Sequence, residues 1–158
     1  MSTPTLFTTD AVITAARLSG LTGLDKGRPY LFDDMYVALD DAAAANWFWE
    51  VSKQACMVLK SWGNNFRDCD KFSRFVQSLG AVTHALQWKE QLFGKNGGLG
   101  IGVLNYKPDN DAERHSINTL LTKVKGKPQP LFRFFEPQTG SELFLSTTEK
   151  ASADMLLL

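Results

Sequence analysis

The chain has 158 residues, of which 44% are hydrophobic and 22% charged, with 17 basic and 17 acidic side chains. This length and apolar content suit one compact domain over residues 1–158. The balanced charge provides no basic stripe for nucleic acid, and no apolar run is long enough to cross a membrane. The first residues lack a signal-peptide pattern, so we expect a cytoplasmic protein whose two cysteines are free thiols.

The first half of the sequence predicts helices, and we expect residues 1–65 to form a helical N-terminal portion. The Ala-rich residues 10–20 begin with a capping aspartate and end at a glycine, as helices often do. Over residues 40–63, apolar side chains recur every three or four positions, which is typical of a helix with one buried face. Residues 26–39 combine turn residues with short apolar pieces, and fit either a strand or an irregular loop.

After residue 100 the pattern changes to short strands that are rich in β-branched or aromatic residues and separated by turn-forming segments. The expected strands cover residues 101–106, 115–124, 131–137 and 142–146. They predict an antiparallel meander, followed by a short helix capped by Thr147 or Thr148. The predicted fold class is therefore α+β, with the N-terminal helices packed on a C-terminal antiparallel sheet.

Cys69 lies between two aspartates in the segment DCDKF, at the predicted start of a third helix that Gly80 ends or bends. Flanking carboxylates disfavour a thiolate, so a reactive thiol needs positive charge from elsewhere. His115 opens one predicted strand and Glu136 closes the next, so a meander would bring both to one end of the sheet, near Cys69. A helix N-terminus and an imidazolium each stabilise a thiolate. The arrangement therefore suits a thiol nucleophile.

The order of DCDKF, a Gly-interrupted strand GLGIGVLNY, then HSIN and FFEPQTG resembles the papain-like cysteine peptidase domain at the C-terminus of the Marasmius oreades agglutinin, and similar stand-alone bacterial and phage proteins. The resemblance implies a papain-like fold with residues 66–145 as catalytic core, and a cysteine-dependent hydrolase, a thiol protease, acting on proteins or peptides. In that family the cysteine is the nucleophile, the histidine the base and the glutamate orients the imidazole. These roles fall on Cys69, His115 and Glu136, while Lys71 departs from the family pattern.

The oxyanion of such a reaction would be met by the Cys69 backbone amide and a side-chain donor, for which Gln138, Asn64 and Asn65 are the candidates. The chemistry itself requires no cofactor. Two other classes of function remain open. A protein that passes the acyl group to an amine would be an acyltransferase, as in transglutaminases. A protein that keeps the fold without turnover would be a binding or inhibitory module.

Three acidic residues, Asp109, Asp111 and Glu113, alternate along the segment before the histidine, as in oxygen-rich calcium loops. Solvated loop charge is the commoner explanation of such a pattern. The agglutinin domain depends on calcium, so the resemblance adds a calcium site at these residues as a hypothesis. A zinc site built from the two cysteines and the two histidines lacks the short ligand spacing of known zinc motifs.

Three side chains of the second predicted helix also bear on function. Cys56 lies on the flank of the apolar stripe and is expected to be a half-buried small residue. Trp47 and Trp49 cannot both face inward from one helix. One of the two tryptophans is therefore expected to line a cleft or a partner surface.

Overall fold

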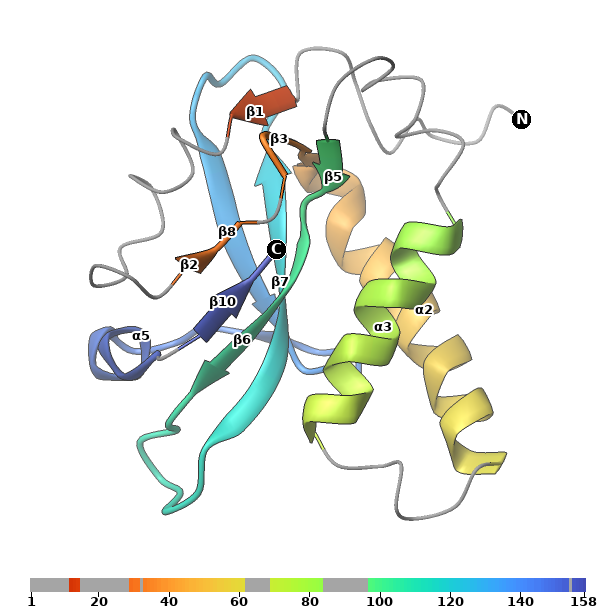
Figure 1. Ribbon diagram of the computed structural model, residues 1–158, viewed down its shortest axis with the longest axis vertical. Coiled ribbons are helices and arrows are strands. Elements are labelled where there is room, and N and C mark those ends of the chain that lie inside the picture. The colour runs from red at the N-terminus through yellow and green to blue at the C-terminus, as the bar shows by residue number, and fades with distance from the viewer. Residues whose placement is uncertain (1–11, 15–28, 32, 62–68, 84–96, 154) are drawn as a thin grey trace.

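The computed structural model describes the chain apart from residues 1–11, 15–28, 32, 62–68, 84–96 and 154. Two helices cover one face of a mixed sheet, and a short third helix lies on the other side (Figure 1). The α+β class predicted from the sequence is therefore confirmed. No helix of the described residues combines the length and the apolar character needed to span a membrane.

The described elements follow one another in the order strands, two helices, strands, short helix, strand. They are β1 (Val12–Thr14), β2 (Pro29–Tyr30), β3 (Met35–Val37), β4 (Leu39–Asp40), α2 (Asp41–Ser61), α3 (Cys69–Thr83), β5 (Gly97–Leu99), β6 (Ile101–Tyr106), β7 (His115–Lys123), β8 (Pro130–Phe135), β9 (Glu142–Leu143), α5 (Thr147–Ser152) and β10 (Met155–Leu157).

The described strands form two sheets, a smaller one of order β1-β3-β5 and a larger one of order β2-β10-β6-β7-β8-β9 with β4 added beside β7. The strands from β10 to β9 pair antiparallel, which confirms the predicted meander. Strand β2 joins β10, and β4 joins β7, in parallel. These parallel pairings were not predicted, because strands that are far apart in the sequence leave no local pattern of their partnership.

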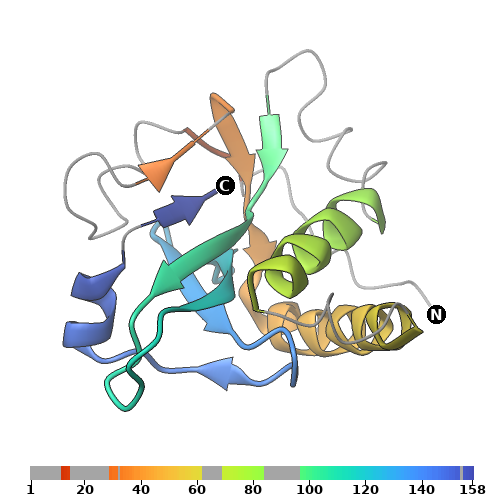
Figure 2. The same cartoon turned by 60° about the horizontal axis from the view of Figure 1, so that its bottom comes forward.

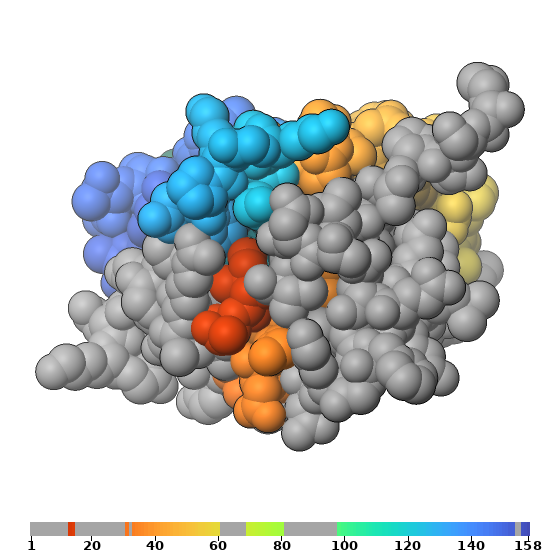
Figure 3. Space-filling model, turned by 90° about the horizontal axis from the view of Figure 1, so that it is seen from above, coloured from red at the N-terminus to blue at the C-terminus, as the bar shows by residue number. Residues whose placement is uncertain are grey.

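Among the described residues of 1–65, the prediction of a helical portion is confirmed for Asp41–Ser61, which form α2. Before Asp41 the described segments are four strands, and β1 lies within residues 10–20, which were expected to form a helix. Strand β1 pairs with β3 and buries Ile13, so backbone pairing and burial outweigh the weak helical preference of the Ala-rich segment. Seen from above, β1 (red) forms part of the molecular surface beside its partner strand β3 (orange, Figure 3).

Helix α2 buries most of the face that its spacing predicts. The fully or almost fully buried residues of this face are Ala44, Phe48, Val51, Ala55 and Leu59. Phe48 stacks on Phe135 of β8 with 4.7 Å between ring centroids, while Val58 is 37% exposed. Trp47 packs against this core and Trp49 is 45% exposed, so of these two tryptophans Trp47 alone faces inward, as expected. Burial of each large apolar side chain contributes about 1.5–3 kcal/mol.

Helix α3 is held on the sheet by polar contacts as well as by its apolar face. The Asn118 side chain of β7 donates hydrogen bonds to the carbonyl oxygens of Ser73, at 2.8 Å, and Gly102, at 3.0 Å. Gln77 of α3 donates to the carbonyl of Ile101 at 2.9 Å. These bonds link α3 to β6 and β7, and so set the position of its first residue along the sheet.

Two helix ends differ from the prediction. Helix α3 continues through Gly80, because this glycine allows close packing: a Cβ there would lie 2.7 Å from Cδ1 of Ile101 and 2.9 Å from the Trp47 ring. The N-cap of α5 is Ser146 rather than either predicted threonine. Its hydroxyl accepts from the N–H of Glu149, whose carboxylate accepts from the Ser146 N–H, which completes a capping box.

The guanidinium of Arg133 joins the start of α2 to β8 and β9. It donates to both carboxylate oxygens of Glu142, at 2.7 and 2.8 Å, and to the carbonyl oxygen of Asp41 at 2.8 Å. Hydrogen bonding to Glu142, reinforced by the charges of both acidic residues, raises the pKa of Arg133 above its usual value. Thr122 of β7 adds a bond to the Asp41 carboxylate.

Replacing Arg133 should destabilise the fold, because Arg133→Gln leaves two half-buried carboxylates without their shared cation. We expect a loss of about 2–3 kcal/mol in the free energy of unfolding, measured by urea denaturation at neutral pH. Lys125→Gln, in an exposed turn, is the matched control and should change stability by less than about 0.5 kcal/mol. Equal stability of the two variants would contradict the structural role of Arg133.

Candidate thiol site

Three chain segments meet at one end of the larger sheet, at the lower end of Figure 1 and facing forward in Figure 2. Cys69 is the first residue of α3, and His115 is the first residue of β7. Glu136 directly follows the last residue of β8. Because β7 and β8 are antiparallel neighbours, the start of one and the end of the other lie at the same edge.

The structure brings the three side chains into contact. Nε2 of His115 lies 2.5 Å from Oε2 of Glu136. Sγ of Cys69 accepts a hydrogen bond from the backbone N–H of Ser116, with 3.4 Å between the nitrogen and sulfur, and the Cys69 side chain lies close enough to His115 to raise the pKa of the imidazole. Since Glu136 occupies Nε2, Nδ1 is the ring nitrogen left to exchange a proton with the thiol.

The imidazole carries positive charge at neutral pH. The hydrogen bond to Glu136 is the main cause that raises the pKa of His115 from 6.5 to about 9, while burial opposes the rise and contact with Cys69 adds to it. Only 24% of the His115 side chain and 15% of the Glu136 side chain are exposed, so solvent screens their contact weakly. The positive charge of the imidazole therefore lies beside the Cys69 side chain.

Glu136 is held by a tight turn over residues 136–141. Its Oε1 accepts from the N–H of Gln138 at 3.1 Å, and its own N–H donates to the carbonyl of Ser141 at 2.8 Å. Its carbonyl accepts from the N–H of Gly140 at 2.7 Å. Gly140 has φ of +78°, a left-handed conformation that favours glycine. The turn therefore fixes both the backbone and the carboxylate of Glu136.

Tyr106 is a residue of this region that the sequence analysis missed. It pairs with His115 across β6 and β7, and its buried ring lies 6.1 Å from the imidazole, centroid to centroid. Burial, followed by the charges of Glu149 and Glu136, raises the pKa of Tyr106 to about 12. Its hydroxyl therefore stays neutral at physiological pH. Only strand register, which the sequence did not define, could have identified this residue.

The supporting residues proposed from the sequence have different outcomes. Asn64 and Asn65 lie outside the described residues. Gln138 has an exposed side chain, and its clearest contribution is the backbone N–H that it donates to Glu136. A role for any of the three in holding an oxyanion stays a prediction.

The three acidic residues proposed for calcium lie in the exposed loop between β6 and β7. Oδ2 of Asp109 accepts a hydrogen bond from Ser146 at 2.6 Å, and Oδ1 of Asp111 accepts one from the N–H of Glu113 at 3.1 Å. Among the described residues, no three His, Cys, Asp or Glu side chains gather in a group suited to a metal ion. Calcium binding at this loop stays an untested hypothesis.

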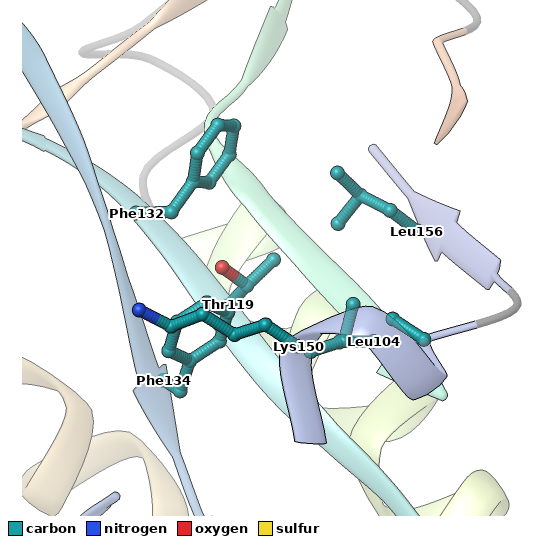
Figure 4. A pocket seen from close by; sticks show the side chains of 7 residues that line it. Leu104, Thr119, Phe132, Phe134, Lys150 and Leu156 are labelled. Carbon is teal, nitrogen blue, oxygen red and sulfur yellow. The ribbon is translucent and has the colours of Figure 1, made fainter. Parts of the chain in front are cut away.

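A separate hollow opens on the face of the sheet opposite α2 and α3 (Figure 4). Its volume is about 40 Å³, and its lining residues are Leu104, Thr119, Phe132, Phe134, Lys150, Ala153 and Leu156. Apart from one hydroxyl and one ammonium group, this lining is apolar. The hollow therefore lacks the nucleophile and the base that the thiol site provides.

No family model and no curated protein matches the sequence. Several solved structures match its fold, among them the following two. One is a PSL1a–E64 complex, with 22% identity, a TM-score of 0.63, and coverage of 94% of this chain and 50% of that chain. The other is Polyporus squamosus lectin bound to the human-type influenza-binding epitope Neu5Aca2-6Galb1-4GlcNAc, with 20% identity, a TM-score of 0.62 and the same coverage. The chain thus spans about half the length of these neighbours, and identities this low establish a shared fold alone.

These neighbours contradict the prediction of a papain-like cysteine peptidase. They are structures of a lectin, neither is described as a peptidase, and no family model supports the proposed membership. The assignment of the chain as a hydrolase of the thiol protease class is corrected accordingly. Short motifs such as DCD and EPQ record a local arrangement of side chains, and they carry too little information to assign a family.

The charge on His115 can be tested by following its ring protons by NMR as the pH rises. The titration midpoint should lie near pH 9 in the parent protein and move down toward 6.5 in Glu136→Gln, because the hydrogen-bonded carboxylate is the largest cause of the raised pKa. The chain has two histidines, so a His84→Gln variant assigns the signals. A midpoint near 6.5 in the parent would contradict the contact.

The same contact should make stability depend on pH. Because the pKa of His115 is raised on folding, its stabilising effect is complete below about pH 6.5 and is lost as the pH rises through 9. The difference in unfolding free energy between the parent and Glu136→Gln should therefore shrink over this window, from at most about 3 kcal/mol.

Proposed function

We propose that the protein is a thiol-dependent acyltransferase with Cys69 as nucleophile, His115 as proton carrier and Glu136 as the group that orients the imidazole. The observation that supports this proposal is the closeness of the three side chains, with a carboxylate 2.5 Å from an imidazole whose pKa is raised further by the neighbouring thiol. Nucleophile, base and orienting group in this order are the elements of covalent acyl transfer. The papain-like arrangement of helices and sheet stays a prediction on which this chemistry does not depend.

In the first half of the reaction the Cys69 thiolate attacks the carbonyl carbon of an acyl donor. A carbon–sulfur bond forms, and the bond to the leaving group breaks as the leaving group takes a proton from the His115 imidazolium. In the second half a primary amine attacks the thioester and gives its proton to His115. A carbon–nitrogen bond forms, the carbon–sulfur bond breaks, and the thiolate and imidazolium are restored.

The carbonyl oxygen gains negative charge in both halves of this reaction. The N-terminus of α3, a helix of 15 residues, directs its first backbone N–H groups toward the region of Cys69. Hydrogen bonds from such groups to a developing oxyanion typically accelerate acyl transfer by about 10²–10³-fold. Placing the nucleophile on the first residue of the helix therefore supports the thiolate and the oxyanion together.

Acyl transfer can be tested with p-nitrophenyl acetate as donor and dansylcadaverine as the primary amine. The parent protein should form an acetyl adduct on Cys69 and then acetylated amine, both followed by mass spectrometry. Cys69→Ala should lose both products, and Glu136→Gln should lower their rate by about 10²-fold or more, because the imidazolium loses its partner. Cys56→Ala keeps the thiol site and serves as the control for labelling of the second cysteine.

Two outcomes would overturn the proposal. One is an acetylation rate of the parent no higher than that of Cys69→Ala. The other is an acetyl adduct on Cys69 that gives acetate and no acetylated amine, even at saturating dansylcadaverine.

A second candidate is a binding module of the same fold that recognises a glycan without turnover. It is supported by the lectin neighbours, one of which is bound to a sialylated trisaccharide. In this chain Trp49 is 45% exposed and the Lys53 ammonium lies 5.9 Å from its ring centroid. An exposed aromatic ring beside an ammonium suits a sugar that carries a carboxylate, whereas the apolar hollow offers few hydrogen-bond groups for sugar hydroxyls.

Glycan binding can be measured by calorimetric titration with Neu5Aca2-6Galb1-4GlcNAc. Under this second candidate the parent protein binds the trisaccharide and Lys53→Ala binds it several-fold more weakly, because the carboxylate loses its cation. The same trisaccharide without the sialic acid is the matched control ligand. Absence of heat at millimolar trisaccharide would exclude this candidate and leave the acyl-transfer proposal unaffected.

A further inference from the structure

We infer that helix α2 positions Glu136 through a seat formed by Trp49, Ser52 and Cys56, and that Cys56 is a positioning residue of the thiol site. The α2 seat, as these three residues are called below, supports the turn over residues 136–141. The inference rests on the proposed function only in that this function explains why Glu136 needs a fixed position. The contacts that support the inference, and the experiment that tests it, concern the His115–Glu136 pair and do not require turnover.

The three residues of the α2 seat share one side of the helix, at spacings of three and four positions. This side lies next to the buried face that packs on the sheet. Ser52 is buried and Cys56 is half-buried, whereas Trp49 is 45% exposed. The seat therefore marks the border between the core and the surface, where the turn after β8 passes over α2.

The turn approaches the seat most closely at Gly140. A Cβ at this position would lie 2.5 Å from Oγ of Ser52 and 2.8 Å from Cε3 of Trp49, so the backbone itself fills the available space. Ser52 Oγ donates to the carbonyl of Trp49 at 3.0 Å, which holds its own side chain in place. Since the N–H of Gly140 donates to the carbonyl of Glu136, this packing limits where the glutamate can lie.

Cys56 contacts the same turn at a second point. Its Sγ donates to the carbonyl oxygen of Gln138 across 3.5 Å. The N–H of Gln138 donates in turn to Oε1 of Glu136, and Oε2 of Glu136 contacts His115. A continuous series of contacts thus joins the Cys56 thiol to the His115 imidazole, which lies beside Cys69. A shift of the Gln138 backbone would move the carboxylate relative to the ring.

The α2 seat also explains why a large aromatic side chain is exposed on α2. The edge of the Trp49 ring borders Gly140, and Lys53 lies over the ring. The ring therefore acts as a rigid wall beside the turn, and burial in the core is not required for this role. Met57, 69% exposed on the same helix, is absent from the described contacts of the turn and provides a comparison.

The test compares Cys56→Ala with Cys56→Ser, both of which leave Cys69 as the single thiol of the chain. The first variant removes the donor to Gln138, and the second replaces it with a hydroxyl donor. Two readouts report the site: the NMR titration midpoint of His115, and the rate at which iodoacetamide alkylates Cys69 at pH 6. Thermal unfolding of each variant reports stability separately.

We expect Cys56→Ala to lower the His115 midpoint by about half a unit or more, because a displaced carboxylate stabilises the imidazolium less, and to slow alkylation of Cys69 by roughly threefold to tenfold, because the imidazole is held less firmly beside the thiol. In Cys56→Ser the alkylation rate of Cys69 should stay within about twofold of the parent rate. Because the parent has two cysteines, its Cys69 rate is measured by peptide mass spectrometry. Trp49→Ala should shift both readouts in the direction of Cys56→Ala, and Met57→Ala should shift neither.

The inference is overturned if Cys56→Ala and Trp49→Ala keep the parent midpoint and alkylation rate, including the case in which only their thermal stability falls. That case would show that the α2 seat contributes to packing alone. Both readouts are independent of turnover. If no amine is acetylated but the seat variants shift both readouts as expected, the acyltransferase proposal is therefore wrong and the positioning role of α2 stands.

Discussion

The antiparallel register of β7 with β8 is the constraint on which the thiol site depends. Asn118 pairs with Phe135, so the first residue of β7 and the residue after β8 project beyond the same end of the ladder. A slip by one residue would turn every side chain of one strand to the other face of the sheet and separate His115 from Glu136. The buried polar contacts of Asn118 with α3 and β6 oppose such a slip, because they would lose their partners.

The same register decides which charges act on Cys69. Asp70 is adjacent in the sequence, but it is exposed and its charge is screened by water. His115 is remote in the sequence, yet it lies near Cys69 in a half-buried position, and Glu136 keeps it protonated. Distance through the protein and exposure therefore outweigh adjacency along the chain. A thiol between two aspartates can lie in a locally positive environment when the sheet supplies an imidazolium.

The fold of this protein does not by itself identify its function. The chain shares its fold with lectin structures at an identity too low to carry an activity over, and these neighbours overturned the peptidase assignment made from short motifs. The contact of thiol, imidazole and carboxylate does not depend on that assignment, because it follows from strand order and helix position. A proposal about chemistry must therefore rest on the geometry of the site, and a proposal about the partner on binding measurements.

The amino-acid sequence alone determined the elements whose pattern is local. The apolar spacing of α2, the turn-bounded strands of the meander and the positions of Cys69, His115 and Glu136 at element ends were readable from it, since each depends on neighbours within a few residues. The tertiary structure decided what depends on long-range pairing. This includes the strand β1 within a helix-like segment, the parallel additions of β2 and β4, and the place of Tyr106 opposite the imidazole. It also includes the support of the Glu136 turn by α2, because residues more than 80 positions apart meet there only once helix and sheet have packed together.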